Sequence, residues 1–149
     1  VGLFVNAEQQ AIEAIADGCR LSLIQLHGDE PPDLCRALSR RVIKAFRVKD
    51  ESSVSRLSDY RVSAYLLDTY VKGAMGGTGK VFDWNLALKA KSYGRIILAG
   101  GLNPDNVASA VLQVRPYGVD VSSGVEARPG RKDSAKVKAF IRAVRETET

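Results

Sequence analysis

The sequence predicts an α/β fold in which helices cover a parallel sheet, and it favours a barrel over an open doubly wound sheet. Short β-branched or Leu-rich runs alternate six times with amphipathic, helix-like stretches. Runs such as Ile96–Ala99 are apolar throughout, as is typical of a parallel strand that is buried on both faces. Polar or small residues follow the strands in four different units, and barrel enzymes place their active sites at that end.

The strands and helices can be assigned in order along the chain. Each expected strand is a short run of mostly apolar residues, and each expected helix repeats apolar residues at a spacing of three or four. Asn103 followed by Pro104, Asp83 and Asp133 are side chains suited to begin a helix. The expected strands cover residues 1–5, 21–26, 42–48, 63–67, 95–99 and 119–122, and the expected helices cover residues 8–17, 32–39, 51–59, 85–92, 105–114 and 134–145.

One connection is longer than the others and contains the stretch GGTGKVFDW, residues 76–84. Long connections in compact domains are usually functional or disordered. Glycine lets the backbone approach a ligand closely, and Thr78 and Lys80 add polar groups. We therefore expect this segment to act as a lid over a bound ligand, with Gly77 among the substrate-binding residues.

Length and composition indicate one enzyme-sized domain, residues 1–149, in the cytoplasm. No apolar run approaches the length of a membrane span, and the first residues lack the basic flank of a signal peptide. Cys19 and Cys35 have neither metal-type spacing nor histidine neighbours, so we expect both to be reduced and without a catalytic role. The net charge of +5 could indicate a nucleic-acid partner, but it could equally favour a phosphorylated small molecule or have no specific meaning. Nucleic acid is disfavoured as a partner, because no aromatic residues lie among the basic residues near the C-terminus.

Asp68 and His27 are the candidate side chains for acid–base chemistry. Asp68 ends the apolar strand just before the long connection, where partial enclosure would favour the protonated form of a general acid. His27, the single histidine, follows another strand directly and could contact a substrate carboxylate or ring. A capping carboxylate and a structural histidine are the alternative interpretations of the two residues.

Two small-residue turns predict a phosphate site. Gly100 and Gly101 follow one strand, and Ser122, Ser123 and Gly124 follow the next. Unhindered backbone N–H groups in such turns can bind an anion without lysine or arginine. Either turn alone could simply be a tight turn, but two in successive units match the phosphate site that barrels often build after their last strands. Elsewhere, Asp120 could point into the barrel or support the site, and a structural role is as plausible. Lys44 and Arg47 could line the pocket, but such residues are more often charges of the barrel layers or rim.

In order along the chain, the sequence resembles the phosphoribosylanthranilate isomerase family. The matching strings are VGLFVN, IQLHGDE, LLD, GGTGKVFDW, LAGGLNPDNV, GVDVSSGVE and PGRKD. The resemblance implies a (β/α)8 TIM barrel that performs an Amadori rearrangement of N-(5'-phosphoribosyl)anthranilate in tryptophan biosynthesis. Such an enzyme is an intramolecular oxidoreductase of the aldose–ketose type, and it needs no metal or organic cofactor. The resemblance also implies that Asp68 is the general acid and that His27 lies near the anthranilate. The residues that it implies for phosphate contact are Gly101, Ser123 and Gly124.

The chain departs from this family at its beginning. The family's base is a cysteine in a Lys-x-Cys-Gly motif on strand one, and an arginine after strand two meets the anthranilate carboxylate. The match starts at strand three, and neither Cys19 nor Cys35 aligns with that base. We therefore expect an N-terminally truncated, incomplete barrel that is inactive alone and self-associates or binds a complementing N-terminal fragment. The alternatives are a non-catalytic barrel fragment that binds a phosphorylated ligand, or another phosphate-binding barrel enzyme such as indole-glycerol-phosphate synthase or ribulose-phosphate epimerase.

Overall fold

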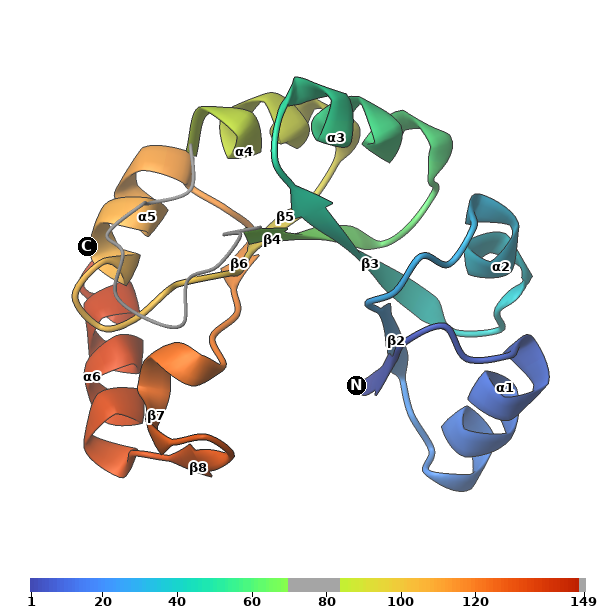
Figure 1. Cartoon of the computed structure of the whole chain (residues 1–149), viewed down its shortest axis with the longest axis horizontal. Coiled ribbons are helices and arrows are strands. Elements are labelled where there is room, and N and C mark those ends of the chain that lie inside the picture. The colour runs from blue at the N-terminus through green and yellow to red at the C-terminus, as the bar shows by residue number, and fades with distance from the viewer. Residues whose placement is uncertain (70–83, 148–149) are drawn as a thin grey trace.

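The computed structural model describes residues 1–69 and 84–147, and its centre is a curved parallel sheet. The strands are hydrogen-bonded in chain order, and all five pairings are parallel. Figure 1 shows the helices on the convex side of this sheet. The α/β class with a parallel sheet is therefore confirmed. The six strands are β1 (Gly2–Phe4), β2 (Leu23–Leu26), β3 (Arg41–Val48), β4 (Ala64–Thr69), β5 (Ile96–Leu98) and β6 (Gly118–Val119).

The helices alternate with these strands, as the sequence predicts. Short 3₁₀ turns extend α3 and α4, and a third, η3 (Ser123–Val125), follows β6. Asp133 caps the last helix as expected, because its carboxylate accepts hydrogen bonds from the backbone N–H groups of Ala135 (2.8 Å) and Lys136 (3.1 Å). The α-helices are α1 (Gln9–Gly18), α2 (Pro32–Ala37), α3 (Glu51–Ser55), α4 (Trp84–Ala90), α5 (Val107–Val114) and α6 (Ser134–Arg145). None of the described helices is long and apolar enough to cross a lipid bilayer.

The main hydrophobic core lies between the sheet and the helices. Alternate residues of each strand face this layer, because side chains alternate across a strand. Each helix turns one apolar stripe toward the strands, for example Ile12 and Ala16 of α1. The fully buried side chains of this core include Ile24, Leu26, Leu57, Leu67, Ile96, Leu98, Val107 and Val114.

The concave face of the sheet carries the other set of side chains. A second apolar cluster covers its middle, where it is formed by Ile43, Ala45, Ala64, Leu66 and Ala99. At the β1 edge, Val1, Leu3 and Val5 are more than half exposed. Within the described residues β1 pairs with β2 alone and β6 pairs with β5 alone, so the sheet has two edges.

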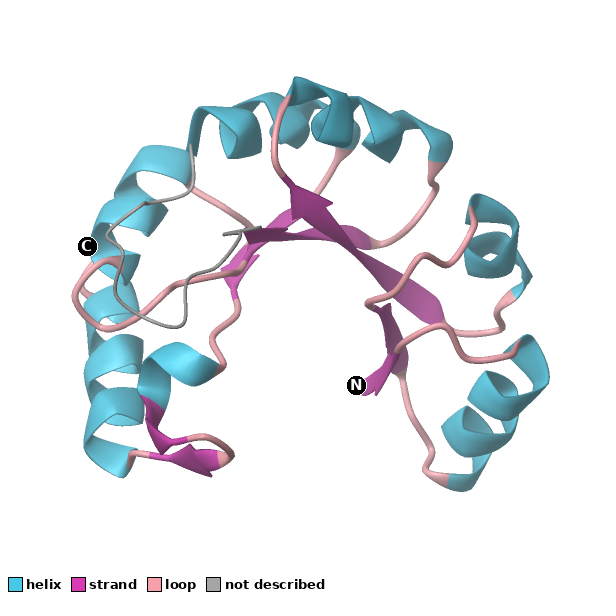
Figure 2. Ribbon diagram, in the orientation of Figure 1, coloured by secondary structure: helices cyan, strands magenta, loops and turns pink. Residues whose placement is uncertain are grey.

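Apart from shifts of one or two residues at other element ends, the structure differs from the sequence-based assignment at three places. β6 ends at Val119, and residues 120–122 form the loop that leads into η3. The fifth helix begins at Val107 instead of residue 105, because the Asn103 side chain accepts hydrogen bonds from the N–H groups of Asp105 and Asn106 and holds a turn there. An antiparallel hairpin of β7 (Glu126–Arg128) and β8 (Arg131–Lys132) was not expected, and Figure 2 shows it apart from the parallel sheet.

Candidate active site

Asp68 and His27 meet at the carboxyl end of the sheet. Asp68 is near the end of β4 and His27 follows β2, with β3 paired between these two strands. The Nε2 atom of His27 lies 3.4 Å from Oδ2 of Asp68, and the two side chains are 23% and 32% exposed. A substrate can therefore reach this pair, and the strands fix the backbone positions of both residues.

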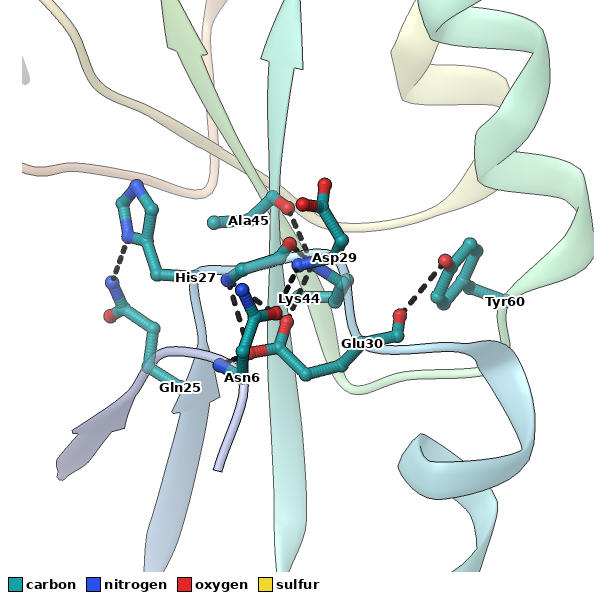
Figure 3. A network of polar contacts seen from close by, with 9 residues as sticks. Asn6, Gln25, His27, Asp29, Glu30, Lys44, Ala45 and Tyr60 are labelled. Carbon is teal, nitrogen blue, oxygen red and sulfur yellow. Dashed lines mark hydrogen bonds and ion pairs between the residues drawn. The ribbon is translucent and has the colours of Figure 1, made fainter. Parts of the chain in front are cut away.

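A glutamine holds the far side of the imidazole. Nε2 of Gln25, in β2, lies 3.2 Å from Nδ1 of His27, so both ring nitrogens of the histidine have a polar partner (Figure 3). The backbone N–H of His27 donates to the carbonyl of Phe4 in β1 at 2.9 Å. The ring thus lies between two side-chain partners on a backbone that is still part of the sheet.

A buried ion pair lies beneath the loop that carries His27. Oε2 of Glu30 is 3.1 Å from Nζ of Lys44, and the two side chains are only 1% and 3% exposed. The ammonium group also donates to the carbonyls of Gly28 (2.8 Å) and Ala45 (2.9 Å). Figure 3 shows Lys44 reaching up from β3 into this group of polar atoms. The ammonium therefore has an acceptor for each of its three N–H groups.

Glu30 also joins two loops. Its carboxylate accepts hydrogen bonds from the backbone N–H groups of Asn6 (2.8 Å) and Gly28 (2.9 Å to Oε2). The Asn6 side chain in turn accepts from the N–H of Asp29 at 2.7 Å. Asn6 has a φ of 51°, a left-handed conformation that asparagine tolerates better than most residues. The loops after β1 and β2 are consequently tied together by one carboxylate and one amide.

Gly28 is required by this packing. A Cβ atom added at Gly28 would lie 2.2 Å from Oδ1 of Asn6 and 2.8 Å from Oε1 of Glu30. Those two oxygens are held by their own hydrogen bonds and cannot easily move away. Only glycine lets the two loops approach this closely.

The surroundings of the buried ion pair shift the pKa values of Glu30 and of Cys35. Burial by itself would raise the pKa of Glu30, but the hydrogen bond from the Asn6 N–H and the interactions with Lys44 outweigh it, so the pKa lies below its ordinary value. Burial raises the pKa of the Cys35 thiol, which keeps it protonated and unreactive. Cys19 is exposed at the end of α1. Cys35 is on α2 and Cys19 follows α1, and within the described residues neither is a hydrogen-bond partner of His27 or Asp68.

The two small-residue turns pack against each other. Gly100 and Gly101 have φ values of 75° and 68°, which favour glycine. A Cβ added at Gly124 would lie 1.8 Å from the carbonyl oxygen of Leu102, so the turn after β6 touches the turn after β5 directly. Ser122 and Ser123 are exposed beside this contact. Their backbone and hydroxyl groups, with the exposed Gly101, are the groups that could bind an anion.

The structure places the remaining candidates as follows. Gly77 and the rest of residues 76–83 lie outside the described residues. Asp120 is exposed after β6. Arg47 is exposed, is the β3 neighbour of Asp68 in the strand register, and with His27 lines a cavity of about 530 Å³. The described residues hold no group of three or more His, Cys, Asp or Glu side chains that could bind a metal ion.

Sequence reasoning missed the most highly connected residues of the site. Asn6, Gln25 and Glu30 were not selected, and Lys44 was considered only as a residue that could line a pocket. A signal was present for Lys44, because a lysine inside the apolar run of β3 needs a buried partner. The sequence does not indicate that this partner is Glu30.

In this parallel α/β sheet, an acid, a histidine and two small-residue turns all lie at the carboxyl ends of the strands. Barrel enzymes have their active sites at this end of the sheet. The sequence shows which family of such enzymes this chain is related to. Residues 1–143 match the family model described as N-(5'phosphoribosyl)anthranilate (PRA) isomerase. The chain belongs to this family.

Individual relatives agree with the family match. The N-(5'-phosphoribosyl)anthranilate isomerase of Geobacter sulfurreducens is 60% identical over 142 residues, which are 95% of this chain and 70% of the relative. That of Pelobacter propionicus is 54% identical over the whole chain and 71% of the relative. The chain therefore spans about 70% of the length of these enzymes.

Solved structures agree with both the family and the fold. The phosphoribosyl anthranilate isomerase of Thermotoga maritima superimposes with a TM-score of 0.89 at 47% identity, covering 97% of this chain and 72% of the other. A phosphoribosyl anthranilate isomerase in complex with reduced 1-(o-carboxyphenylamino)-1-deoxyribulose 5-phosphate superimposes with a TM-score of 0.85 at 43% identity, covering 97% and 70%. The latter protein binds a phosphorylated small molecule.

Proposed function

We propose that this protein is an isomerase of tryptophan biosynthesis that converts N-(5'-phosphoribosyl)anthranilate to 1-(2-carboxyphenylamino)-1-deoxyribulose 5-phosphate. Family membership and the relative with a bound, reduced form of that product support the reaction. The single observation that carries the mechanism is the contact between His27 and Asp68 at the accessible carboxyl end of the sheet. Such a pair can move a proton at a bound sugar.

Asp68 acts as the general acid. The protonated carboxyl gives its proton to the furanose ring oxygen while the anthranilate nitrogen lone pair forms a double bond to C1' and the C1'–O bond breaks. The open-chain iminium then loses a proton from C2' to a base. The resulting enaminol becomes the ketose by gaining a proton at C1' and losing the 2'-hydroxyl proton. Asp68 is left as a carboxylate next to Nε2 of His27, whose hydrogen bond stabilises that charge.

The phosphate of the substrate binds at the two packed turns. Gly101, Ser123 and Gly124 supply backbone N–H groups, and Gly100 and Ser122 belong to the same turns. The close contact of Gly124 with Leu102 supports this assignment, because it brings both turns into one site. Gly77 is proposed as a further substrate contact by resemblance alone.

We also propose that residues 1–149 form a single domain whose sheet is closed into a barrel only by strands that these residues do not supply. The two sheet edges and the exposed Val1, Leu3 and Val5 support this idea. By the resemblance the base is a cysteine of strand one, and we propose that it too lies outside these residues. The purified 149-residue chain should therefore show no turnover, and substantial turnover would refute both statements.

The test of Asp68 is the substitution Asp68→Asn in the active protein, by which we mean the complete barrel that also has the remaining strands and the base. We expect kcat to fall by about 100-fold or more, the usual scale of general acid–base catalysis, while the affinity for a product analogue is nearly unchanged. An unchanged kcat would remove Asp68 from the mechanism. If the unsubstituted complete barrel binds the analogue but does not turn over substrate, the function is phosphate-ligand binding and not isomerisation.

A further inference from the structure

We propose that Gln25 is a positioning residue that fixes the tautomer of His27, so that the ring always presents an N–H to Asp68. This inference rests on the proposed function only in the role it gives to Asp68. The geometry concerns three side chains in a row, in which Gln25 contacts Nδ1 of His27 and Asp68 contacts Nε2 (Figure 3 shows the first contact).

The glutamine nitrogen determines which ring atom carries the proton. A side-chain amide nitrogen has two donors and no acceptor, so Nε2 of Gln25 at 3.2 Å requires a lone pair on Nδ1 of His27. A neutral imidazole has one donor and one acceptor, so the proton is on Nε2. That nitrogen is 3.4 Å from Oδ2 of Asp68 and can donate to it.

The opposite orientation of the amide is unfavourable next to an ionised Asp68. It would place the glutamine oxygen against Nδ1, which would then have to carry the ring proton. Nε2 would face the carboxylate with a lone pair, and two acceptors would repel at that distance. With Asp68 ionised, the orientation of the Gln25 amide in the structure is the one that gives both contacts a donor and an acceptor.

Both ends of the Gln25 contact are held by regular structure. Gln25 is in β2, where it pairs with Leu3 of β1 and Ile43 of β3. His27 is two residues further along the chain, and the loop after it is held by the buried Glu30 carboxylate through the N–H of Gly28. The backbone of both residues is therefore fixed by hydrogen bonds of the sheet or of this loop.

The tautomer matters for the step after proton release. Once Asp68 has given its proton to the sugar oxygen, a new negative charge remains on its carboxylate. An Nε2–H group stabilises that charge by a charge-assisted hydrogen bond, and His27 gains and loses no proton in doing so. With the proton on Nδ1 instead, the ring would destabilise the same charge.

The single histidine of the chain makes this inference directly measurable. In a two-bond ¹H–¹⁵N spectrum of the 149-residue protein at about pH 8.5, where an ordinary imidazole is neutral, Nδ1 should be unprotonated and Nε2 protonated. Gln25→Glu replaces the donor by an acceptor, and we expect Nδ1 to acquire a proton. Gln25→Met removes the donor, and a mixture of both tautomers should appear.

Gln10→Glu is the matched control, because it makes the same charge change at an exposed position of α1 and should leave the spectrum unchanged. An Nδ1 that is already protonated in the wild type would overturn the inference. So would an Nδ1 that stays unprotonated in Gln25→Glu.

Kinetics of the active protein provide a second measurement. Loss of a hydrogen bond to a charged group corresponds to a decrease of about tenfold or more, so kcat should fall by that factor in Gln25→Glu and not in Gln10→Glu. The spectrum and the Asp68→Asn assay test separate claims, so a negative result in one leaves the other standing. An unchanged rate in Asp68→Asn contradicts the general acid but not the tautomer, whereas an unchanged spectrum in Gln25→Glu contradicts the tautomer but not the acid.

Discussion

Replacement of Glu30 by glutamine would leave the Lys44 ammonium buried without its counter-charge. Removing one partner of a buried ion pair typically costs about 3–5 kcal/mol of unfolding free energy. Lys44 keeps two carbonyl acceptors, those of Gly28 and Ala45, and glutamine keeps one oxygen for the loop N–H groups. We therefore expect the lower end of that range, about 3 kcal/mol, or roughly 6–12 °C in Tm for a chain of this size.

A double-mutant cycle separates the ion pair from other effects. Lys44→Met in the Glu30→Gln background removes the unpaired charge and should restore about 2 kcal/mol, because a buried pair can often be replaced by uncharged residues at little cost. The exposed pair Glu51–Lys89 is the control, and Glu51→Gln should cost less than about 1 kcal/mol. Urea denaturation of the wild type, Glu30→Gln, Lys44→Met, the double variant and the control Glu51→Gln measures these values. A cost below about 1 kcal/mol for Glu30→Gln, or simple additivity in the cycle, would refute the reasoning.

The same substitution predicts a pH dependence. The pKa of Glu30 is lower in the folded state than its ordinary value, because hydrogen bonds from the Asn6 N–H and Lys44 outweigh the opposing effect of burial. The ionised side chain therefore stabilises the fold fully above the unfolded-state pKa of about 4.3, and this contribution is lost as the pH falls through the lower, folded-state pKa. The difference in stability between wild type and Glu30→Gln should be constant near neutral pH and shrink below about pH 4. A difference that grows on acidification would contradict this assignment.

Two further substitutions test the phosphate turns and a helix cap. Gly124→Ala forces a Cβ against the Leu102 carbonyl, so it should cost about 1–3 kcal/mol in thermal unfolding and weaken binding of a phosphorylated product analogue. Gly18→Ala, where no atom lies within 4 Å of the added Cβ, should show neither effect. Asp133→Ala removes the cap of α6 and should cost about 1 kcal/mol in urea unfolding, whereas Asp133→Asn should retain most of it.

The regular elements were predictable wherever two independent signals agreed. The helix expected at residues 134–145 has those bounds in the structure, because apolar periodicity and the Asp133 cap indicate the same start. β3 was placed to within one residue by its long apolar run. Where a single signal was available the bounds were wrong. Val119 and Val121 alternate like a strand, but only Val119 pairs with β5.

The hairpin of β7 and β8 was missed for a different reason. Its strands carry mostly charged and exposed residues, so there is no apolar alternation to detect. Gly130, with a φ of 77°, allows the tight turn between them. Backbone pairing without a buried face leaves almost no trace in the hydrophobic pattern.

The candidate site was predictable as a set of strand ends but not as a set of contacts. A polar residue directly after an apolar strand is expected at the carboxyl end of the sheet, and this argument selected Asp68 and His27. Their contact depends on the curvature of the sheet and on how far the loop after β2 projects, neither of which follows from spacing. Glu30 was missed because a carboxylate in a polar string resembles an ordinary exposed loop residue until its position over β3 is known.

β3 determines both halves of the proposed acid–base pair. On one face of this strand, Lys44 holds Glu30 and so the loop that carries His27. At its carboxyl end, the register with β4 places Asp68 beside Arg47. A shift of β3 by one residue would exchange the faces on which Lys44 and Arg47 lie, which would separate Glu30 from its partner. The buried ion pair therefore does more than stabilise the fold, because it makes the register of β3 and the meeting of His27 with Asp68 depend on each other.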